Sequence, residues 1–319
     1  AAQCGIRTDN AFNIARIQSI DTRRILGELD VGRVVIITGF QGVTHNHDVT
    51  TLGRGGSDIT GAAVAAGLGA GVCEIYTDVD GVLSADPNRV PSARLWREIS
   101  YEEAIEMASS GAKVLHPRAA EVCMAYDIPI HVRSSFHRGE GTWIRGGDEM
   151  VKEQAAVVGV SSDKNISKIT LREVPDRPGM AAKVFQDLAA EVISVRLIIQ
   201  SASAEGLGRI TFVLDDEYAD GAARLVERWT EEGITTEGII DHDVAKISII
   251  GSRLASTPGL PGRMFAVLAH EGINIDCISS SEMKVACVIA AEHIDHAVRA
   301  VHDEFFPRGS TVDASGPAG

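Results

Sequence analysis

The sequence predicts an α/β protein whose second half contains two ferredoxin-like modules of the order βαββαβ. In residues 1–147, β-branched runs that suit buried strands alternate with helical segments, as in an α/β domain with a largely parallel sheet. After residue 155, one order of strands and helices occurs twice at a fixed spacing. Between these parts, Gly139–Glu153 contains four glycines and indicates a domain boundary.

The elements of the first part follow from local signals. Strands are predicted from short apolar or alternating runs at Val34–Thr38, Val72–Thr77 and Ile128–Arg133. Helices are predicted at Ser57–Leu68, Tyr101–Ser109 and Pro117–Tyr126. A Ser-Asp pair is expected to cap the first helix, a capping box of Ser100 and Glu103 opens the second, and a proline opens the third.

The repeat is visible in two Pro-Gly loops. Asp176–Gly179 precedes a helix with Phe185, and Ser256–Gly259 precedes a helix with Phe265, so the copies are offset by 80 residues. Each copy is expected to run strand, loop, helix, two strands and helix, which is the ferredoxin-like order. The predicted strands are Ser167–Leu171, Val192–Gln200, Arg209–Leu214, Ala245–Gly251, Ile273–Ser280 and Val285–Ala290. The domains are therefore expected at residues 1–147, 155–244 and 245–308.

Composition excludes several classes of protein. The chain has 319 residues and a net charge of −14, which argues against a nucleic-acid partner. No apolar stretch reaches the length of a membrane span, so we expect no membrane association and a cytoplasmic location. The five cysteines are scattered without a CxxC pair, which predicts reduced buried thiols and no protein-held metal.

The first candidate site is the glycine-rich loop Thr50–Asp58, which leads into a predicted helix. Its glycines allow close approach of a ligand, and the helix N-terminus offers free N–H groups to an anion. Arg54 can bind a carboxylate or phosphate, and Asp58 can accept from an ammonium group. From composition alone, a tight turn capped by Ser57 is an equally good interpretation.

Two further segments carry polar groups. Tyr76–Pro87 follows a predicted strand, where α/β sheets place ligands, and its Asp78, Asp80 and Asp86 could organise a nucleotide-bound magnesium through water. Taken alone, an Asp/Gly-rich surface turn is favoured there. In Gly111–Pro117, Lys113 could neutralise phosphate charge, although a single lysine is usually solvated, and His116 is expected to be structural.

These three segments, in this order and spacing, resemble the motifs of the aspartate kinase family. Ile130–Ser135 is similar to the end of that catalytic domain, and the repeat after residue 155 resembles its two ACT domains. The resemblance covers essentially the whole chain. It implies part of the three-layer αβα sandwich of an amino acid kinase, followed by two ACT domains. It also implies ATP-dependent phosphorylation of the β-carboxylate of L-aspartate to 4-phospho-L-aspartate, with Mg²⁺.

The resemblance also implies roles for individual residues. Arg54 would hold the α-carboxylate of aspartate, and Ser57 and Asp58 would complete the catalytic pocket. The substrate-binding residues would be Phe40, Arg54, Gly55, Gly56, Ser57 and Asp58. The nucleotide-binding residues would be Tyr76, Thr77, Asp78, Val82, Leu83, Asp86, Pro87, Lys113 and Val114. Two positions depart from the family pattern: Leu83 replaces a common tyrosine, and Asn88 replaces a common arginine that the adjacent Arg89 could supply.

The ACT pair implies feedback by lysine, threonine or both, and assembly into a homo- or hetero-oligomer. The effector contacts would be Asp176, Gly179, Ala181, Ser194, Val195, Arg196, Gln200, Leu260, Pro261, Asn274, Ile275, Ser281 and Glu282. In the first copy, Ser194-Val195-Arg196 replaces the usual Asn-Ile-Asp, which Asn274-Ile275-Asp276 keeps in the second. Arg196 puts a positive charge where an effector ammonium favours an acid, so we expect weakened or altered effector binding there.

Two other interpretations compete with a catalytic aspartate kinase. The family's first glycine-rich segment, with Lys-Phe-Gly-Gly-Thr-Ser, is not in these residues, so we expect a truncated chain with little kinase activity alone. A non-catalytic regulatory chain that binds amino acids is the alternative, but about 150 residues with intact substrate motifs favour the enzyme. A kinase of glutamate or of a nucleotide is disfavoured by the ACT pair and by TTLGRGGSD at 50–58.

Overall fold

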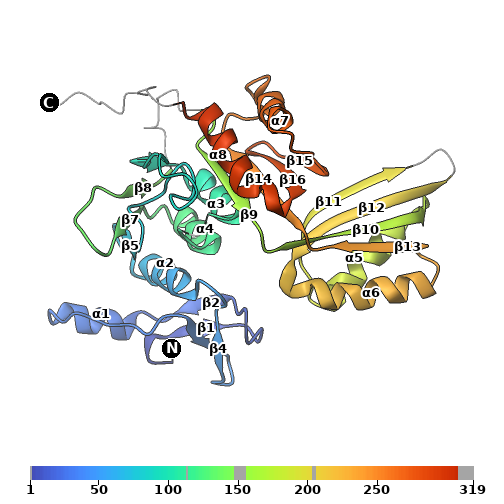
Figure 1. Cartoon of the computed structure of the whole chain (residues 1–319). Coiled ribbons are helices and arrows are strands. Elements are labelled where there is room, and N and C mark those ends of the chain that lie inside the picture. The colour runs from blue at the N-terminus through green and yellow to red at the C-terminus, as the bar shows by residue number, and fades with distance from the viewer. Residues whose placement is uncertain (1, 113, 147–155, 203–205, 308–319) are drawn as a thin grey trace. The chain divides into compact units, whose positions relative to one another are not determined.

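The computed structural model describes residues 2–112, 114–146, 156–202 and 206–307 (Figure 1). The chain folds as two compact units. The first unit contains residues 1–161 and 250–257, and the second contains residues 162–249 and 258–319. A short segment far along the chain therefore belongs to the first unit. Among the helices that the structure describes, none has the length and hydrophobicity of a membrane span.

The first unit contains two four-stranded sheets. One has the order β2-β1-β3-β4, built from β1 (Ile6–Thr8), β2 (Ile17–Ile20), β3 (Gln41–Val43) and β4 (Val49–Thr51). The other has the order β5-β7-β8-β6, built from β5 (Cys73–Thr77), β6 (Glu98–Ile99), β7 (Ile130–Ser134) and β8 (Thr142–Ile144). The predicted strands Val72–Thr77 and Ile128–Arg133 are β5 and β7, which pair in parallel, and this second sheet is largely parallel because β6 and β8 are parallel as well. The first sheet is mixed and was not predicted. A short connection joins β7 to β8, so these strands run antiparallel.

Three helices of the first unit begin and end close to the predicted positions: α2 (Gly56–Leu68), α3 (Tyr101–Ser110) and α4 (Pro117–Ala125). The helices η1 (Ala2–Cys4) and α1 (Arg23–Asp30) were not predicted. The capping box of α3 is confirmed: Glu103 N–H donates to Ser100 Oγ at 3.1 Å, and Ser100 N–H donates to Glu103 Oε2 at 3.2 Å. The predicted N-cap of α2 is wrong, because Gly55 holds that position and no side chain caps the helix.

The predicted strand at Val34–Thr38 is also wrong. These residues form no strand, and the side chains of Val34 and Ile36 are 91% and 94% exposed. A β-branched run becomes a strand only when a neighbouring strand completes its backbone hydrogen bonds, and within the described residues no strand pairs with it. The predicted boundary Gly139–Glu153 is too early, since β8 lies inside it; residues 147–155 lie outside the described part of the chain.

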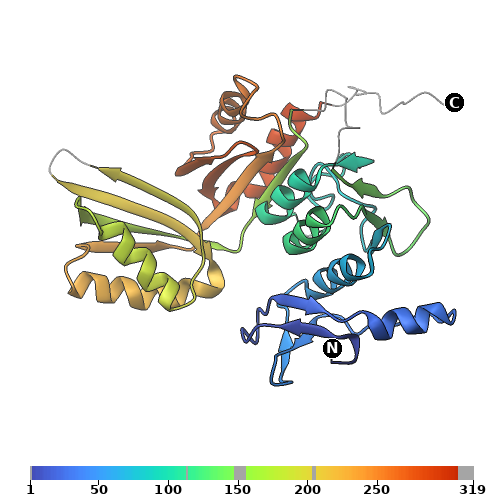
Figure 2. The ribbon, with the colours of Figure 1, turned by 180° about the vertical axis from the view of Figure 1, so that it is seen from behind.

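The first ferredoxin-like copy lies wholly in the second unit. Its elements are β10 (Ile166–Pro175), α5 (Met180–Ala190), β11 (Val195–Ala202), β12 (Leu207–Asp215), η2 (Asp216–Tyr218), α6 (Ala219–Glu231) and β13 (Glu237–Asp241). The sheet has the order β11-β12-β10-β13, with every neighbouring pair antiparallel. Helices α5 and α6 lie side by side against one face of this sheet (Figures 1 and 2). The predicted βαββαβ order is confirmed.

The second copy takes one strand from elsewhere in the chain. It contains β14 (Val244–Ile250), α7 (Leu260–His270), β15 (Cys277–Ser280), β16 (Lys284–Ala290), η3 (Ala291–His293) and α8 (Ile294–Phe305). Its sheet has the order β15-β16-β14-β9, where β9 (Gly159–Asp163) precedes the whole first copy. The domain predicted at residues 155–244 places β9 in the first copy, but β9 pairs with β14 in the second sheet. In that sheet β9 occupies the edge position that β13 occupies in the first.

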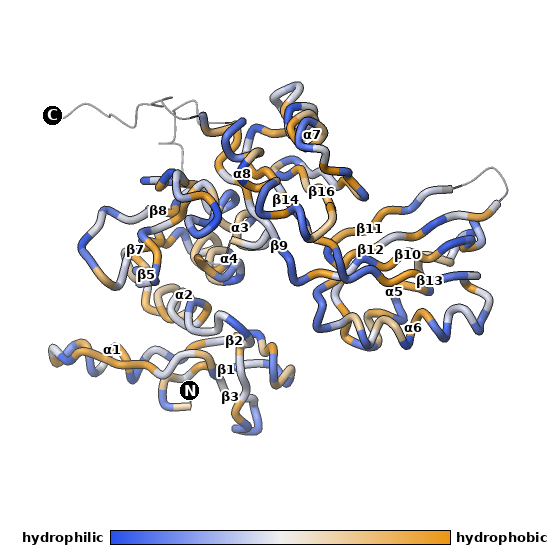
Figure 3. Tube along the Cα trace, in the orientation of Figure 1, coloured by the Kyte–Doolittle hydropathy of each residue, from blue (hydrophilic) through white to orange (hydrophobic). Residues whose placement is uncertain are grey.

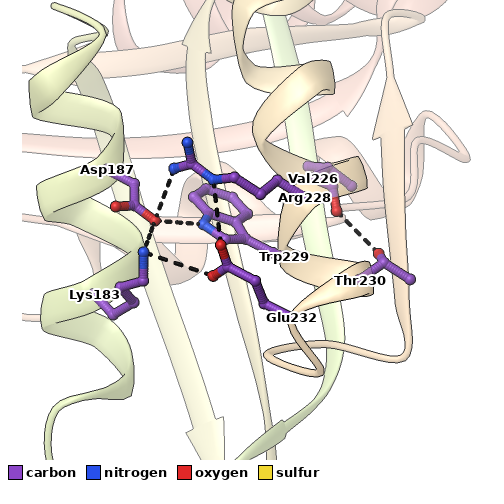
Figure 4. Close-up of polar contacts among 7 residues, drawn as sticks. All are labelled: Lys183, Asp187, Val226, Arg228, Trp229, Thr230 and Glu232. Carbon is purple, nitrogen blue, oxygen red and sulfur yellow. Dashed lines mark hydrogen bonds and ion pairs between the residues drawn. The ribbon is translucent and has the colours of Figure 1, made fainter.

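Packing of the first copy depends on an amphipathic α6. Hydrophobic and hydrophilic residues alternate along it in Figure 3, and its buried side includes Leu225, Val226 and Trp229. The indole N–H of Trp229 donates to Asp187 of α5 at 2.8 Å. Asp187 also accepts from Lys183 at 2.6 Å and pairs with Arg228 at 3.1 Å (Figure 4). One carboxylate thus joins the two helices.

We expect Asp187→Ala to lower the free energy of unfolding by about 1–3 kcal/mol, because a buried indole N–H and two cations lose their acceptor. Thr230→Ala is the matched control, since the hydroxyl of exposed Thr230 donates to the carbonyl of Val226 in the same helix. Denaturant unfolding of both variants provides the measurement. Equal losses would contradict a special role for Asp187.

The same network should depend on pH. Burial raises the pKa of Asp187, but the hydrogen bonds from Lys183, Trp229 and Arg228 outweigh it and hold that pKa below its ordinary value of 3.8. The stabilisation is therefore present above pH 3.8 and is lost as pH falls through the lower, folded-state value. The stability difference between wild type and Asp187→Ala should shrink in that range.

Candidate active site and effector sites

The loop that ends at Asp58 joins β4 to α2. Gly53 and Gly55 have φ of +85° and +73°, a left-handed conformation that only glycine adopts without strain. Gly55 is the N-cap of α2 and has no side chain to satisfy the first N–H groups of the helix. The N–H groups of Gly56 and Asp58 donate to the carbonyls of Gly53 and Gly55 at 3.0 and 3.2 Å. Of the first three N–H groups of α2, that of Ser57 is thus the one without such an acceptor among the described residues, and it can bind an anion.

Asp58 is held in place by a segment far along the chain. Its Oδ2 accepts the backbone N–H of His116 at 3.1 Å, and its Oδ1 lies 3.4 Å from the hydroxyl of Ser57. The ring of His116 caps α4 by accepting the N–H of Arg118 through Nδ1 at 3.1 Å. Burial, and next the charge of Arg118, lower the pKa of His116, so the ring is neutral at pH 7 and can act as this acceptor. His116 is structural, as expected.

Arg54 lies in the middle of this loop, whereas Phe40 precedes the loop in sequence and borders it in space, where its carbonyl accepts the N–H of Leu52 at 2.9 Å. Arg54 is exposed, and it forms no ion pair with any residue that the structure describes. Phe40 has φ of +74°, and its ring would lie 2.9 Å from a Cβ at Gly56. The close approach of Phe40 thus explains why position 56 is a glycine. The loop combines a solvent-accessible cation with a fixed carboxylate four residues later.

One residue of this site was missed from the sequence. Arg118 donates to the carbonyls of Leu52 and Ala15 at 3.1 and 3.0 Å, and so ties α4 to the start of the glycine-rich loop. An arginine after His-Pro has no local partner in the sequence. Its role depends on carbonyls that are distant along the chain, so no local signal could have identified it.

The segment Tyr76–Pro87 begins at the carboxyl end of β5, beside the parallel strand β7. Tyr76 is 56% exposed, with the guanidinium of Arg133 5.8 Å from its ring centre, and Thr77 donates to Asp78 at 3.1 Å. Asp80 interacts with His137 at 2.8 Å. This is the sheet edge at which the sequence predicted a ligand.

The second half of this segment is ordered by its own side chains. Asp86 accepts from the backbone N–H and the side-chain amide of Asn88 at 2.9 and 3.1 Å, and its other oxygen lies 3.7 Å from Arg89. Val82 is buried, Leu83 forms an isolated β-bridge with Leu95, and Pro87 is half-buried. Asn88 replaces an arginine that is common in the family, and the adjacent Arg89 supplies a guanidinium 3.7 Å from Asp86.

The last predicted nucleotide segment is described only in part. Lys113 lies outside the described residues, and Val114 packs partly buried against the core of the first unit. Among the residues that the structure describes, no three His, Cys, Asp or Glu side chains gather as a metal site.

The two predicted effector regions differ in their charges. In the first copy, Arg196 pairs with Asp215 at 2.5 Å and lies 3.7 Å from Asp163. Burial, and next the positive charge of Arg196, lower the pKa of Lys246 to about 8. In the second copy, Asp276 pairs with Lys168. At the same position of the repeat, the first copy therefore has Arg196, which is close to two carboxylates, whereas the second copy has Asp276.

The remaining predicted effector residues occupy equivalent places in the two copies. Gly179 and Gly259 are the N-caps of α5 and α7, with φ of +98° and +89°. Asp176 N–H donates to the carbonyl of Gly206. Ala181, Val195, Pro261 and Ile275 are half-buried, Leu260 is buried, and the exposed positions are Ser194, Gln200, Asn274, Ser281 and Glu282.

The packing at Gly55 yields a stability prediction. A Cβ at Gly55 would lie 2.6 Å from Cδ2 of His116, whereas one at Gly69 would meet nothing within 4 Å. Both glycines have positive φ, so alanine at either costs about 1–2 kcal/mol. Gly55→Ala must also displace the cap of α4, which adds about 0.5–2 kcal/mol. Thermal unfolding should show the larger loss for Gly55→Ala; equal losses would contradict this packing.

Comparisons with known proteins agree with this architecture. The amino acid kinase family model matches residues 1–134, and an ACT domain model matches residues 172–228 and 247–305. Aspartokinase of Thermus thermophilus is 44% identical over 305 residues, covering 95% of this chain and 75% of that protein. Aspartate kinase of Pseudomonas fluorescens (strain SBW25) is 43% identical over 304 residues, covering 95% of this chain and 74% of that protein.

Solved structures show the same relationship. The crystal structure of E. coli aspartokinase III in complex with aspartate and ADP has a TM-score of 0.81 and 29% identity, covering 96% of this chain and 69% of that one. The structure of the same enzyme with lysine and aspartate has a TM-score of 0.72, with 96% and 68% covered. The chain thus spans about three quarters of the length of these curated relatives, and it belongs to the aspartokinase family.

Proposed function

We propose that this chain is the catalytic chain of an aspartate kinase, which transfers the γ-phosphate of ATP to the β-carboxylate of L-aspartate and forms 4-phospho-L-aspartate. The observation that carries this proposal is the loop before α2, where an exposed Arg54 without an ion pair among the described residues precedes the fixed carboxylate of Asp58. These charges suit the two ends of a zwitterion. Relatives named aspartokinase, one solved with aspartate and ADP, support it.

The substrate side of the pocket would use the loop and its surroundings. Arg54 binds the α-carboxylate, and Asp58, with Ser57 beside it, accepts from the α-ammonium group. Gly55 and Gly56 let the substrate approach the N-terminus of α2, where the N–H of Ser57 is available, and Phe40 closes the side of the pocket. Because His116 fixes Asp58, the substrate would meet an arranged acceptor.

The nucleotide would lie at the carboxyl end of β5. Tyr76, Thr77 and Asp78 would line this site, and the segment from Val82 through Leu83 and Asp86 to Pro87 would run beside the nucleotide. Val114 would help to close the site, and Lys113, which lies outside the described residues, is the expected cation for the phosphates. Mg²⁺ would arrive with ATP and contact the acidic residues through water. The attacking carboxylate is already ionised at pH 7, so the transfer needs alignment and charge neutralisation and no general base.

Feedback would act at the ACT copies, with lysine, threonine or both as effector. We propose that the second copy, through Asn274, Ile275 and the Pro-Gly loop, is the main effector site. In the first copy Arg196, which is paired with Asp215, stands where the second copy has Asp276, so an effector ammonium group would meet a cation there in place of an acid.

Assembly would use the edges of the ACT sheets. β11 and β15 are the edge strands of their sheets, and each exposes an isoleucine at the same place in the repeat. Ile198 is 55% exposed and Ile278 is 46% exposed. An exposed edge strand with an apolar side chain favours pairing with another strand, so we propose homo- or hetero-oligomers formed through these edges.

A non-catalytic regulatory chain that binds amino acids is the second candidate, favoured by the complete pair of ACT modules. Calorimetric titration of the chain with L-aspartate, in the presence of ADP and Mg²⁺, separates the two functions. The catalytic function predicts binding of L-aspartate but not of D-aspartate. A chain that binds lysine or threonine but no L-aspartate would support the regulatory function instead.

Arg54→Ala should weaken L-aspartate binding about 10- to 100-fold, because a charge-assisted bidentate contact contributes about 1.5–3 kcal/mol. Arg54→Lys should restore part of this affinity, as a point charge without the fork. The same titration measures it, and ADP affinity should stay unchanged. Arg24→Ala, at an exposed position on α1, is the control. An unaltered aspartate affinity in Arg54→Ala would exclude this role.

The number of effector sites provides a second test. We expect lysine or threonine to bind with one strong site per chain, at the second copy. Asn274→Ala should abolish that site, whereas Ser194→Ala should leave it within about twofold of wild type. Two equivalent sites per chain, or loss of binding in Ser194→Ala, would show that Arg196 does not block the first copy.

A further inference from the structure

Two short segments of the regulatory half are built into the first unit. Residues 156–161 and 250–254, hereafter the crossing segments, lie backbone to backbone: Val158 N–H donates to the carbonyl of Ile250 at 2.7 Å. A Cβ at Gly251 would lie 2.1 Å from the carbonyl oxygen of Ala156, so no other residue fits there without movement. Val158 and Ile250 are 2% and 0% exposed and belong to the hydrophobic core of the first unit.

The first crossing segment is hydrogen-bonded to the proposed nucleotide segment. Val160 N–H donates to the carbonyl of Ser84 at 2.8 Å. The indole N–H of Trp96 donates to the carbonyl of Val158 at 2.7 Å, while its backbone N–H donates to the carbonyl of Val82 at 3.0 Å. The residues between Val82 and Asp86 are thus connected to this crossing segment directly and through Trp96.

The second crossing segment contacts the N-terminal turn of α3. The hydroxyl of Ser252 donates to Glu103 Oε1 at 2.8 Å. Glu103 is fully buried, and its other oxygen accepts from Ser100 in the capping box. At the far end of α3, the hydroxyl of Ser161 donates to the carbonyl of Ser110 at 3.1 Å. Both ends of α3 are therefore bonded to the crossing segments.

These contacts lead to the substrate side as well. The residues that follow α3, 111–116, end in the N–H that holds Asp58. In the other direction, the first crossing segment continues as β9, and the second follows β14 and precedes the Pro-Gly loop at the start of α7. β9 and β14 are neighbours in the second ACT sheet. Packed side chains and hydrogen-bond networks of this kind can carry energetic coupling between distant sites, and measured coupling is what establishes it.

We propose that the crossing segments couple effector binding at the second ACT copy to nucleotide affinity, through the bonds of Ser84 and Trp96 to the first segment and of Glu103 to the second. Ser252, Trp96 and Glu103 are positioning residues in this coupling, since none is placed against substrate. The inference rests on the proposed function, because it takes the nucleotide site and the effector site from it. Coupling is reciprocal, so bound nucleotide must change effector affinity by the same factor.

The test measures the affinity of the full chain for ADP and Mg²⁺ by calorimetry, without effector and with saturating L-lysine or L-threonine. For wild type we expect an affinity ratio of about 5 to 150 with one of these amino acids. Ser252→Ala and Trp96→Phe should bring that ratio toward 1, with ADP affinity in the absence of effector within about threefold of wild type. Their controls are Ser19→Ala, on β2, and Trp143→Phe, whose ring stacks on His131.

Each outcome is decisive. Variants that keep the wild-type ratio, or a wild type that binds ADP and the amino acid with a ratio of 1, would overturn the coupling and leave the proposed function intact. A wild type that binds no ADP would instead overturn the proposed function. Should Trp96→Phe fail to fold, Ser252→Ala removes one hydroxyl and provides the same readout. Amide hydrogen exchange at residues 82–90 should also respond to effector in wild type but not in Ser252→Ala.

Discussion

The hydrogen bond from His116 N–H to Asp58 is the contact on which the proposed active site depends. It joins the start of α2 to the start of α4 across 58 positions of the chain. Several features of the sequence support this contact. Gly55 leaves room for the imidazole of His116, and burial lowers the pKa of that ring, which keeps it neutral. Arg118 donates its backbone N–H to His116 and its guanidinium to the carbonyl of Leu52 in the loop. A carboxylate held by a backbone donor cannot rotate freely, so in the proposed site a substrate would meet an acceptor that is oriented before binding.

The second constraint is topological. The strand that completes the second ACT sheet, β9, precedes the first copy in sequence, and the residues that lead into it, up to Ser161, belong to the first unit. Because β9 and β14 are neighbours, the chain passes through the first unit at two adjacent places. A repeat arranged strictly in tandem would connect to the first unit once. The interleaved order gives two connections, both of which contact α3.

Local signals in the sequence predicted α2, α3 and α4, the strands β5 and β7, and most elements of the two ACT copies, but none of the first sheet, β1 to β4. Long-range contacts explain the predictions that were wrong. The capping box at Ser100, the helices and the offset of 80 residues depend on neighbours in sequence, and the structure confirms them. Val34–Thr38 failed because a strand needs a partner strand, and the N-cap of α2 was misplaced because Gly55 is selected by the ring of His116. Glu103 was read as a capping residue only; its bond to Ser252 lies 149 positions away.

The interleaved ACT modules also have a consequence for folding during synthesis. β9 leaves the ribosome well before β14, and its place in the second sheet stays empty while the first copy is made. Once the first copy folds, its two ends hold β9 and β14 close together, and the entropy of closing a long flexible loop no longer opposes their pairing. The first module thus serves as an intramolecular template for the second. Damage to its core would delay completion of a sheet that contains none of its residues.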